Sequence, residues 1–440
     1  MNMAKSRVAS ESSRRSFLKA SSAVAVAGAM TRSARVHAAG SDEIKIALIG
    51  CGGRGMSAAV QAIRNAAGAR VTLFALADAF RDRVDSAHKI ISGQAADRVD
   101  VPPERRFVGL DAFQKATDCG VDMVLLCGPP GFRPMQFEAA VAAGKHVFME
   151  KPVATDSPGV RRVMAANQKA KEKGLAVAVG HHLRHEVKHR EAIKKIHDGV
   201  IGDLQYIRAY FNSSGVWVRA RQPGQTEMQY QVQNWYYFNW LSGDHIVEQH
   251  VHDLDVGNWM AQAVPVEAQG SGGRQVRIGP DFGEIFDHHT VEFTYANGLK
   301  MFSYSRHIPR CWNSFSQHAH GSRGSVHIEG HGHADVRVAG QDPIRIERGP
   351  GGHQLEHDHL FAALLAGQPY NEGDYGATST MTAILGRMAT YSGQVIRWDD
   401  ALNSKIDLCP ESLEWDAETK VKPGPDGLYA CAMPGTTQVL

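Results

Sequence analysis

Short apolar runs recur through residues 44 to 180, separated by longer mixed segments. The runs are rich in Val, Ile, Leu and Ala and lack the polar alternation of half-exposed strands. Such runs are typical of parallel strands buried on both faces, with helices between them. The strands predicted in this way are Ile44–Ile49, Val71–Ala77, Val121–Leu126, Val147–Met149 and Ala176–Gly180. The pattern predicts a doubly wound parallel α/β sheet in a domain over residues 41–180.

The first predicted strand runs directly into a glycine-rich loop with the pattern G-x-G-x-x-G. In such a loop the first glycine (Gly50) allows a tight turn and the second (Gly52) lets the backbone approach a pyrophosphate. The last glycine (Gly55) permits close packing of helix and strand, and the helix that follows directs its amide groups at the phosphates. We therefore expect these loop residues to bind a dinucleotide: Gly50, Gly52, Gly53, Arg54 and Gly55.

An acidic residue, Asp78, ends the second predicted strand at the spacing of a ribose-binding acid. Its carboxylate can accept hydrogen bonds from both ribose hydroxyls and repels a 2′-phosphate, so NAD is favoured, while Arg81 and Arg83 leave NADP open. Ligands of open α/β sheets bind beyond the carboxyl ends of the strands. Pro129 and the pair Glu150-Lys151 follow two further strands. We therefore expect them to line the same cofactor crevice.

The second half of the chain predicts a substrate-binding domain over residues 181–400, followed by a tail over residues 401–440. Residues 213–234 are rich in Gln and Gly and predict a loop that acts as a lid. Aromatic rings stack on the C–H faces of sugars while polar neighbours hold the hydroxyls. We therefore expect Trp235 and Tyr236 to contact a carbohydrate. Aromatic residues here also suit a sheet core or a subunit interface.

The first forty residues are typical of an export signal. Ser13–Lys19 spells the twin-arginine pattern S-R-R-x-F-L-K, an Ala-rich stretch follows, and Val36-His37-Ala38 is a small-residue cleavage site. The twin-arginine route moves proteins that are already folded, often with a cofactor inside. We expect residues 1–40 to direct the mature chain through this machinery to the periplasm or another extracytoplasmic space.

Composition excludes several other classes of protein. With 48 Lys and Arg against 46 Asp and Glu, the net charge of +2 gives no basis for binding nucleic acid. No apolar run approaches the roughly 20 residues that span a bilayer, so no stable membrane insertion is expected. The six cysteines have no C-x-x-C spacing, which argues against zinc-finger and thioredoxin-like proteins.

Together with Glu150-Lys151-Pro152, Ser242–Asp255 and Glu356–Arg387, the glycine loop gives the chain a specific likeness. It resembles the glucose–fructose oxidoreductase / inositol dehydrogenase / rhizopine catabolism (Gfo/Idh/MocA) family from about Ile44 to Trp398. The resemblance implies a C-terminal α+β domain with a large, open, mostly antiparallel sheet. One face of that sheet lies against the nicotinamide, and the sheet often packs against another subunit, so a homo-oligomer (dimer or tetramer) is expected.

The resemblance also implies the catalytic residues. In the family, the Lys of Glu-Lys-Pro binds the substrate hydroxyl and a later D-x-x-x-H element supplies a carboxylate and a His base. Here these are Lys151 and His252, with Glu248 in place of the usual Asp. If the stretch is one helix, Glu248 and His252 share a face and Asp255 anchors it. A His base suits the reaction because its pKa lies near neutral pH, and a Lys cation stabilises the developing alkoxide.

The same segment departs from the family pattern, because Asp244 and His250 stand where glycine is more usual. The resulting histidine cluster has two interpretations: a divalent metal site, or a polar pocket for sugar hydroxyls. No pair has a strict metalloenzyme spacing such as H-E-x-x-H, so we expect no metal. We place His250 and Asp255 with the substrate. By the resemblance, Arg184 faces the same crevice and contacts substrate or cofactor.

These residues predict an exported NAD(P)-dependent oxidoreductase that moves hydride to or from a hydroxyl carbon of a sugar, sugar acid or cyclitol. The alternative is an NAD-dependent glycoside hydrolase that holds NAD tightly, oxidises a ring hydroxyl transiently, eliminates the aglycone and reduces the ketone again. A sugar–sugar oxidoreductase is also open. A binding protein on an inactive dehydrogenase fold is disfavoured, because the loop, Asp78, Lys151, Glu248 and His252 are all present.

Overall fold

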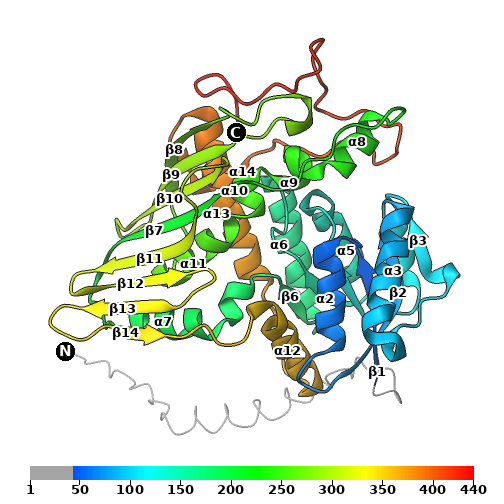
Figure 1. The fold of residues 1–440 in the computed structure, drawn as a ribbon, viewed down its shortest axis with the longest axis horizontal. Coiled ribbons are helices and arrows are strands. Elements are labelled where there is room, and N and C mark those ends of the chain that lie inside the picture. The colour runs from blue at the N-terminus through cyan, green and yellow to red at the C-terminus, as the bar shows by residue number, and fades with distance from the viewer. Residues whose placement is uncertain (1–42) are drawn as a thin grey trace, which may run out of the picture. The chain divides into compact units, whose positions relative to one another are not determined.

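Six parallel strands form the first sheet, in the order β3-β2-β1-β4-β5-β6 (Figure 1). They are β1 (Glu43–Ile49), β2 (Arg70–Asp78), β3 (Arg106–Val108), β4 (Met123–Leu126), β5 (His146–Met149) and β6 (Val177–Val179). The computed structural model describes residues 43–440, so the predicted signal at 1–40 lies outside the described residues. The strand order reverses between β1 and β4, where doubly wound sheets bind their ligands. The predicted doubly wound sheet is confirmed.

Helices connect these strands as the apolar pattern requires. They are α2 (Gly53–Ile63), α3 (Arg81–Ala95), α4 (Ala112–Asp118), α5 (Arg133–Ala142) and α6 (Ser157–Glu172). Every residue of β4 and of β5 is buried, and β1 is buried over its last four residues. This burial explains their continuous apolar runs, because a parallel strand covered by helices on both faces has no solvent side.

The second sheet has nine strands in the order β14-β13-β12-β11-β7-β10-β9-β8-β15. They are β7 (Leu204–Ser213), β8 (Glu267–Gly273), β9 (His288–Thr294), β10 (Lys300–His307), β11 (Ser314–Gly321), β12 (Gly324–Glu329), β13 (Ala334–Val338), β14 (Ile344–Ile346) and β15 (Ile396–Arg397). Only the β7–β10 pair is parallel among the described strands of this sheet. The mostly antiparallel C-terminal sheet implied by the resemblance is therefore confirmed.

Helices cover one face of this second sheet. They are α7 (Val187–His197), α11 (Val251–Ala261) and α13 (Gly373–Ser392). Alternate residues of β10 are buried, as expected when only one face packs against a core. The remaining helices are α8 (Glu227–Gln233), α9 (Asn239–Ser242), α10 (His245–Glu248), α12 (Gly352–Leu365) and α14 (Trp398–Asn403).

Two C-terminal helices tie the halves of the chain together. Helix α12 packs on α2, and α13 (orange in Figure 1) contacts both α6 and the second sheet. The approach of α13 is close: a Cβ on Gly376 would lie 2.9 Å from a methyl group of Val179, and one on Gly386 would lie 2.8 Å from the Phe293 ring. The apolar core is therefore continuous from β6 to the second sheet.

The lid and the tail pack against each other. Residues 213–234 are not a plain loop, because Thr226 caps α8 through a capping box with Gln229. The tail beyond α14 crosses this helix: the Gln231 amide donates to the Val421 carbonyl at 2.8 Å and the Tyr429 hydroxyl donates to Glu227 at 2.5 Å. The tail therefore packs on its own chain.

Among residues 43–440, no helix is both long and apolar enough to cross a membrane. All six cysteines lie in this range and are free thiols. Cys51 is buried behind the glycine loop, which fits the expected packing role of this small side chain.

The tight packing of α2 against β1 makes a test of the fold. A Cβ at Gly55 would lie 2.0 Å from the Gly50 carbonyl oxygen, whereas a Cβ at Gly53 would have no atom within 4 Å. We expect Gly55→Ala to lower the free energy of unfolding by about 1–3 kcal/mol, because the backbone must shift to admit the methyl group. The measurement is thermal or urea unfolding of cofactor-free protein.

Gly53→Ala is the matched control, since it adds the same methyl group in the same helix turn. It should leave stability unchanged or raise it by up to about 1 kcal/mol, because alanine is the better helix former. Equal losses in both variants would contradict the packing argument.

Candidate active site

The glycine loop presents an open, amide-lined end of α2. Gly50 has φ +96°, and a Cβ there would lie 2.3 Å from the Gly128 amide nitrogen, so only glycine fits this turn. Gly52 and Gly53 face open space, with no atom within 4 Å of a built Cβ. No side chain caps the first turn of α2. Its free amides and open approach fit the pyrophosphate of a dinucleotide.

A cavity of about 420 Å³ opens over this loop. Its walls include the predicted cofactor residues Gly50, Gly52, Gly53, Arg54, Gly55, Asp78 and Pro129. Asp78 accepts hydrogen bonds from the amides of Cys51, at 2.7 Å, and Phe80, at 3.0 Å. The carboxylate therefore holds the loop in place and keeps lone pairs for ribose hydroxyls. Burial raises the pKa of Asp78.

The lid supplies the opposite wall of the cavity. Trp217, Arg219 and Trp235 line it, and the Arg219 guanidinium lies 4.8 Å from the centre of the Trp217 ring. The tail links this wall to the Asp78 side of the cavity: the Trp415 carbonyl accepts from the Thr226 hydroxyl of the lid at 2.5 Å, and the Trp415 ring packs on Phe80 with ring centres 5.5 Å apart. The structure therefore places Trp235, predicted to bind the sugar, on the wall of the cofactor cavity.

Arg54 and Glu150 pair with each other. The Arg54 Nε lies 2.5 Å from a Glu150 carboxylate oxygen, and its Nη2 lies 2.6 Å from Glu356 on α12. Arg54, followed by Lys151, lowers the pKa of Glu150 against the effect of burial. The Arg54 guanidinium is thus paired with two carboxylates. Arg54 would contact the cofactor only as part of the glycine loop that lines the cavity. Glu356 lies in the C-terminal stretch that carries the family resemblance, but the sequence assigned it no partner, because it comes from far along the chain.

Lys151, Glu248 and His252 come together in a nearly closed site. The Lys151 ammonium lies 3.2 Å from a Glu248 carboxylate oxygen and also donates to the Glu248 backbone carbonyl. Burial raises the pKa of Glu248, and Lys151 opposes that rise. The pKa of His252 lies well below its usual range, mainly because of burial and then because of the Lys151 charge. His252 is therefore a neutral base beside a cation.

The four-residue spacing of Glu248 and His252 suits a single helix, but the two residues do not lie on one helix. Glu248 ends α10, and α11 begins at Val251, with a break at Gln249 and His250. The break frees the two side chains from a fixed turn of helix. Glu248 contacts Lys151 directly, and the Lys151 charge also lowers the pKa of His252.

Two residues predicted to bind substrate have other partners. His250 is fully buried; Nδ1 lies 3.1 Å from Asp253 and Nε2 lies 2.7 Å from the Ser303 hydroxyl. This histidine packs α11 on β10, and both of its ring nitrogens have partners within the chain. Asp255 accepts from the Arg184 guanidinium at 2.8 Å and from the Ser379 hydroxyl at 2.6 Å.

The Arg184–Asp255 pair therefore acts as internal support rather than as substrate contact. Asp255 is almost fully buried, and a buried carboxylate needs a cation and donors close by. Arg184 also stacks on the Tyr375 ring at 4.0 Å. Both side chains lock the segment after β6 onto α11 and α13.

Tyr236 is buried beside Glu248, which adds to the effect of burial in raising the pKa of Tyr236. Its hydroxyl has no hydrogen-bond partner among the described residues, and its ring stacks on His307 with centres 5.8 Å apart. Two further histidines lie near His252: His182, in the segment that the resemblance places at the crevice, and His353, for which the sequence predicted no role. The His182 ring lies 4.7 Å from His252, and the His353 ring of α12 lies 3.8 Å from His182.

Comparison with known proteins agrees with this architecture. A family model described as an oxidoreductase family with an NAD-binding Rossmann fold matches residues 44–181, and a Gfo/Idh/MocA C-terminal domain model matches 189–327. An uncharacterized oxidoreductase of Streptococcus pneumoniae is 28% identical over 177 residues, which is 40% of this chain and 44% of that protein. Inositol 2-dehydrogenase of Rhizobium meliloti is 26% identical over 302 residues, or 68% of this chain and 79% of that enzyme.

Among solved structures, aldose-aldose oxidoreductase from Caulobacter crescentus matches with a TM-score of 0.64 at 20% identity. The match covers 81% of this chain and 99% of that one, which shows a shared fold. The two family models together cover more than half of the chain, and each falls on one of the two sheets described above. The chain belongs to the Gfo/Idh/MocA family of NAD-binding oxidoreductases.

Proposed function

We propose that this protein moves a hydride between NAD and a hydroxyl carbon of a sugar, sugar acid or cyclitol. One observation carries the proposal: Lys151, Glu248 and His252 converge at the carboxyl end of β5. That strand end lies beside the end of β4, where Gly128 and Pro129 border the dinucleotide cavity. A cation, a carboxylate and a neutral base thus stand next to the site for the redox cofactor.

Each of the three side chains has a distinct task in alcohol oxidation. When bound, NAD supplies the hydride acceptor. Neutral His252 takes the hydroxyl proton, and the Lys151 ammonium donates a hydrogen bond to the substrate oxygen as negative charge develops there. Glu248 orients the Lys151 ammonium through their 3.2 Å contact.

Unpartnered polar atoms around this centre support a polyhydroxylated substrate. The Tyr236 hydroxyl, one Glu248 carboxylate oxygen and His252 Nδ1 are buried without hydrogen-bond partners among the described residues. An unsatisfied buried polar group costs about 1–3 kcal/mol. Sugar and cyclitol hydroxyls both donate and accept hydrogen bonds, so they match this set of donors and acceptors.

The test of this function is hydride transfer by the purified mature chain with NAD and a panel of sugars, sugar acids and cyclitols. We expect NADH to form with a member of the panel, and Lys151→Met to lower kcat by about 100-fold to 1,000-fold, because the charge on the substrate oxygen loses its partner. NAD affinity, measured by calorimetry, should stay within a few-fold.

Lys145→Met is the matched control. Lys145 precedes the same strand at its opposite end, where its ammonium donates to the Val121 carbonyl at 2.8 Å. It should keep full activity. Unchanged turnover in Lys151→Met, or no hydride transfer with any member of the panel, would reject the proposed reaction.

The lid on the cofactor cavity favours a second candidate, an NAD-dependent glycoside hydrolase with retained cofactor. The lid lines the cavity together with the glycine loop, and Trp415 of the tail links the lid to Phe80. We expect this arrangement to slow the release of a bound dinucleotide. Such an enzyme would cleave aryl glycosides without net NADH formation and would carry NAD through gel filtration. Net NADH formation without glycoside cleavage would leave only the dehydrogenase reaction.

The low pKa of His252 leads to a pH prediction. The base works when neutral, so activity falls only as pH drops through its pKa, which lies well below 6.5. We expect kcat/KM for alcohol oxidation to stay constant as pH falls through 6.5 and to decline only at lower pH. The measurement is a pH–rate profile with unfolding checked at each pH. A decline centred at or above pH 6.5 would assign the base to another group.

We propose that the mature chain is exported by the twin-arginine route, since Ser13–Lys19 carries the full pattern. Replacing both arginines, Arg14→Lys with Arg15→Lys, should trap the protein in the cytoplasm with its N-terminal segment uncleaved. Cell fractionation and N-terminal sequencing measure this. Equal export of the double variant, or of the native chain in a strain without the twin-arginine translocase, would contradict the proposal.

A further inference from the structure

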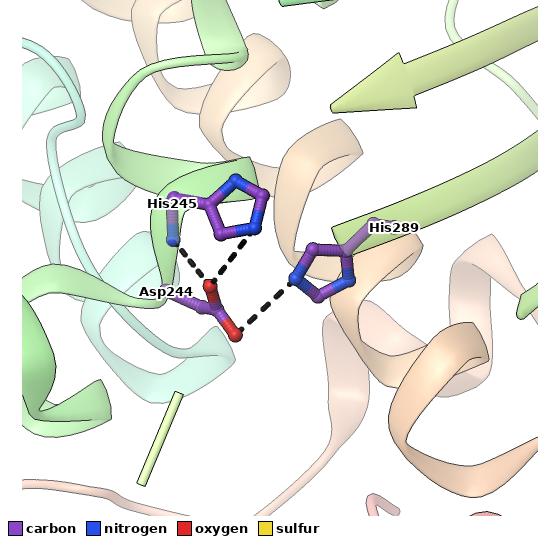
Figure 2. Close-up of side chains that lie close together, drawn as sticks. All are labelled: Asp244, His245 and His289. Carbon is purple, nitrogen blue, oxygen red and sulfur yellow. Dashed lines mark hydrogen bonds and ion pairs between the residues drawn. The ribbon is translucent and has the colours of Figure 1, made fainter. Parts of the chain in front are cut away.

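A second cluster of polar side chains lies at the other end of α10 from Glu248. Asp244 precedes this helix, His245 begins it, and His289 reaches the cluster from β9 (Figure 2). All three side chains are fully or almost fully buried. Neither the family resemblance nor the proposed reaction uses them.

The three side chains point at one another with metal-ligand spacing. An Asp244 carboxylate oxygen lies 3.9 Å from His245 Nε2, and the other lies 3.2 Å from His289 Nε2. One ligand atom from each residue lies within 4.8 Å of the other two. Ligands of a tetrahedral zinc ion, at about 2.0–2.2 Å from the metal, lie about 3.3 Å apart. Small side-chain movements would therefore complete the coordination.

The histidines also lack other partners. Neither ring nitrogen of His245 has a hydrogen-bond partner among the described residues, and the only partner of His289 Nε2 among them is the Asp244 carboxylate, at 3.2 Å. The His245 ring is held between those of His307 and His289, with ring centres 4.4 Å and 4.8 Å away. An imidazole without partners in such a place is uncommon, because buried polar atoms are almost always satisfied. The unpaired His245 nitrogens are therefore an independent indication that the cluster binds an ion.

Hydrogen bonds from neighbouring residues orient His289 and Asp244 toward each other. His289 Nδ1 lies 2.9 Å from the Thr390 hydroxyl, which leaves Nε2 to face Asp244. The Asp244 carboxylate accepts from the Phe286 amide at 2.9 Å and from the Tyr391 hydroxyl at 2.6 Å. Outer contacts of this kind orient metal ligands in known sites. An Asp244–His289 ion pair alone would explain one histidine but leaves both ring nitrogens of His245 without a hydrogen bond among the described residues.

We propose that Asp244, His245 and His289 bind one divalent transition-metal ion of the zinc class. Two imidazole nitrogens with one carboxylate oxygen suit this class of ion. Ca²⁺ and Mg²⁺ prefer sites made of oxygen ligands alone. The ion would link the start of α10 to β9. Because Glu248 ends the same short helix, the ion would also fix the carboxylate that orients Lys151.

The experiment measures metal in the full mature chain, purified without a polyhistidine tag from zinc-supplemented cells. We expect close to one zinc per chain by mass spectrometry after dialysis. Removal with a chelator should lower Tm, and Zn²⁺ should restore it. Cobalt added to the metal-free protein should give the visible bands of a tetrahedral Co²⁺ site.

His289→Gln should lose the metal, while the matched control His288→Gln should keep it. His288 directly precedes His289 on β9. Its side chain is 38% exposed and pairs with Asp287 rather than with the cluster. Cys409→Ser is a second control, because Asp156, Asp407 and Cys409 form another acidic grouping. Loss of the metal in Cys409→Ser, or its retention in His289→Gln, would overturn the assignment.

If His289→Gln does not fold, the wild-type protein still decides the question. No zinc above background, no Co²⁺ bands and no change in Tm on adding Zn²⁺ would together overturn the proposal. These readouts do not use catalysis, so they are independent of whether the proposed hydride transfer is found.

Discussion

The ion pair between Lys151 and Glu248 joins the two domains at the point where chemistry is expected. Lys151 extends from the cofactor domain and Glu248 from the short helix α10 of the second domain, with 3.2 Å between their charged atoms. Each is only slightly exposed, so neither charge has water to replace its partner. Removing one partner of such a buried pair typically costs 3–5 kcal/mol. The pair therefore requires both domains to be docked correctly.

Other buried charges enforce the same docking. Arg54 in the glycine loop bridges Glu150 and Glu356, and so ties the loop to α12. Arg184 and Asp255 tie the segment after β6 to α11. These pairs add directional contacts to the apolar core that α13 shares with both sheets. A hydrophobic core alone tolerates small shifts, whereas paired buried charges do not.

The lid and the tail contribute to the cofactor cavity from outside the parallel sheet. The cofactor domain needs only the strand order and the open end of α2 to bind a dinucleotide. Here Trp217, Arg219 and Trp235 add a further wall, and Trp415 of the tail contacts both Thr226 of the lid and Phe80. This further wall of the cavity comes from the packing of the lid and the tail rather than from the glycine loop.

The sequence by itself determined the parallel sheet, the glycine loop, Asp78 and the placement of Lys151 at a strand end. Each rests on local rules, because apolar runs, required glycines and strand ends are set by nearby residues. Only the tertiary structure decided the partners of each charged group. It placed His250 against Ser303, Arg184 against Asp255 and Arg54 against Glu356, and it brought His289 to Asp244. Burial of a polar side chain selects its partner by position in space, and a single sequence carries no local signal for that choice.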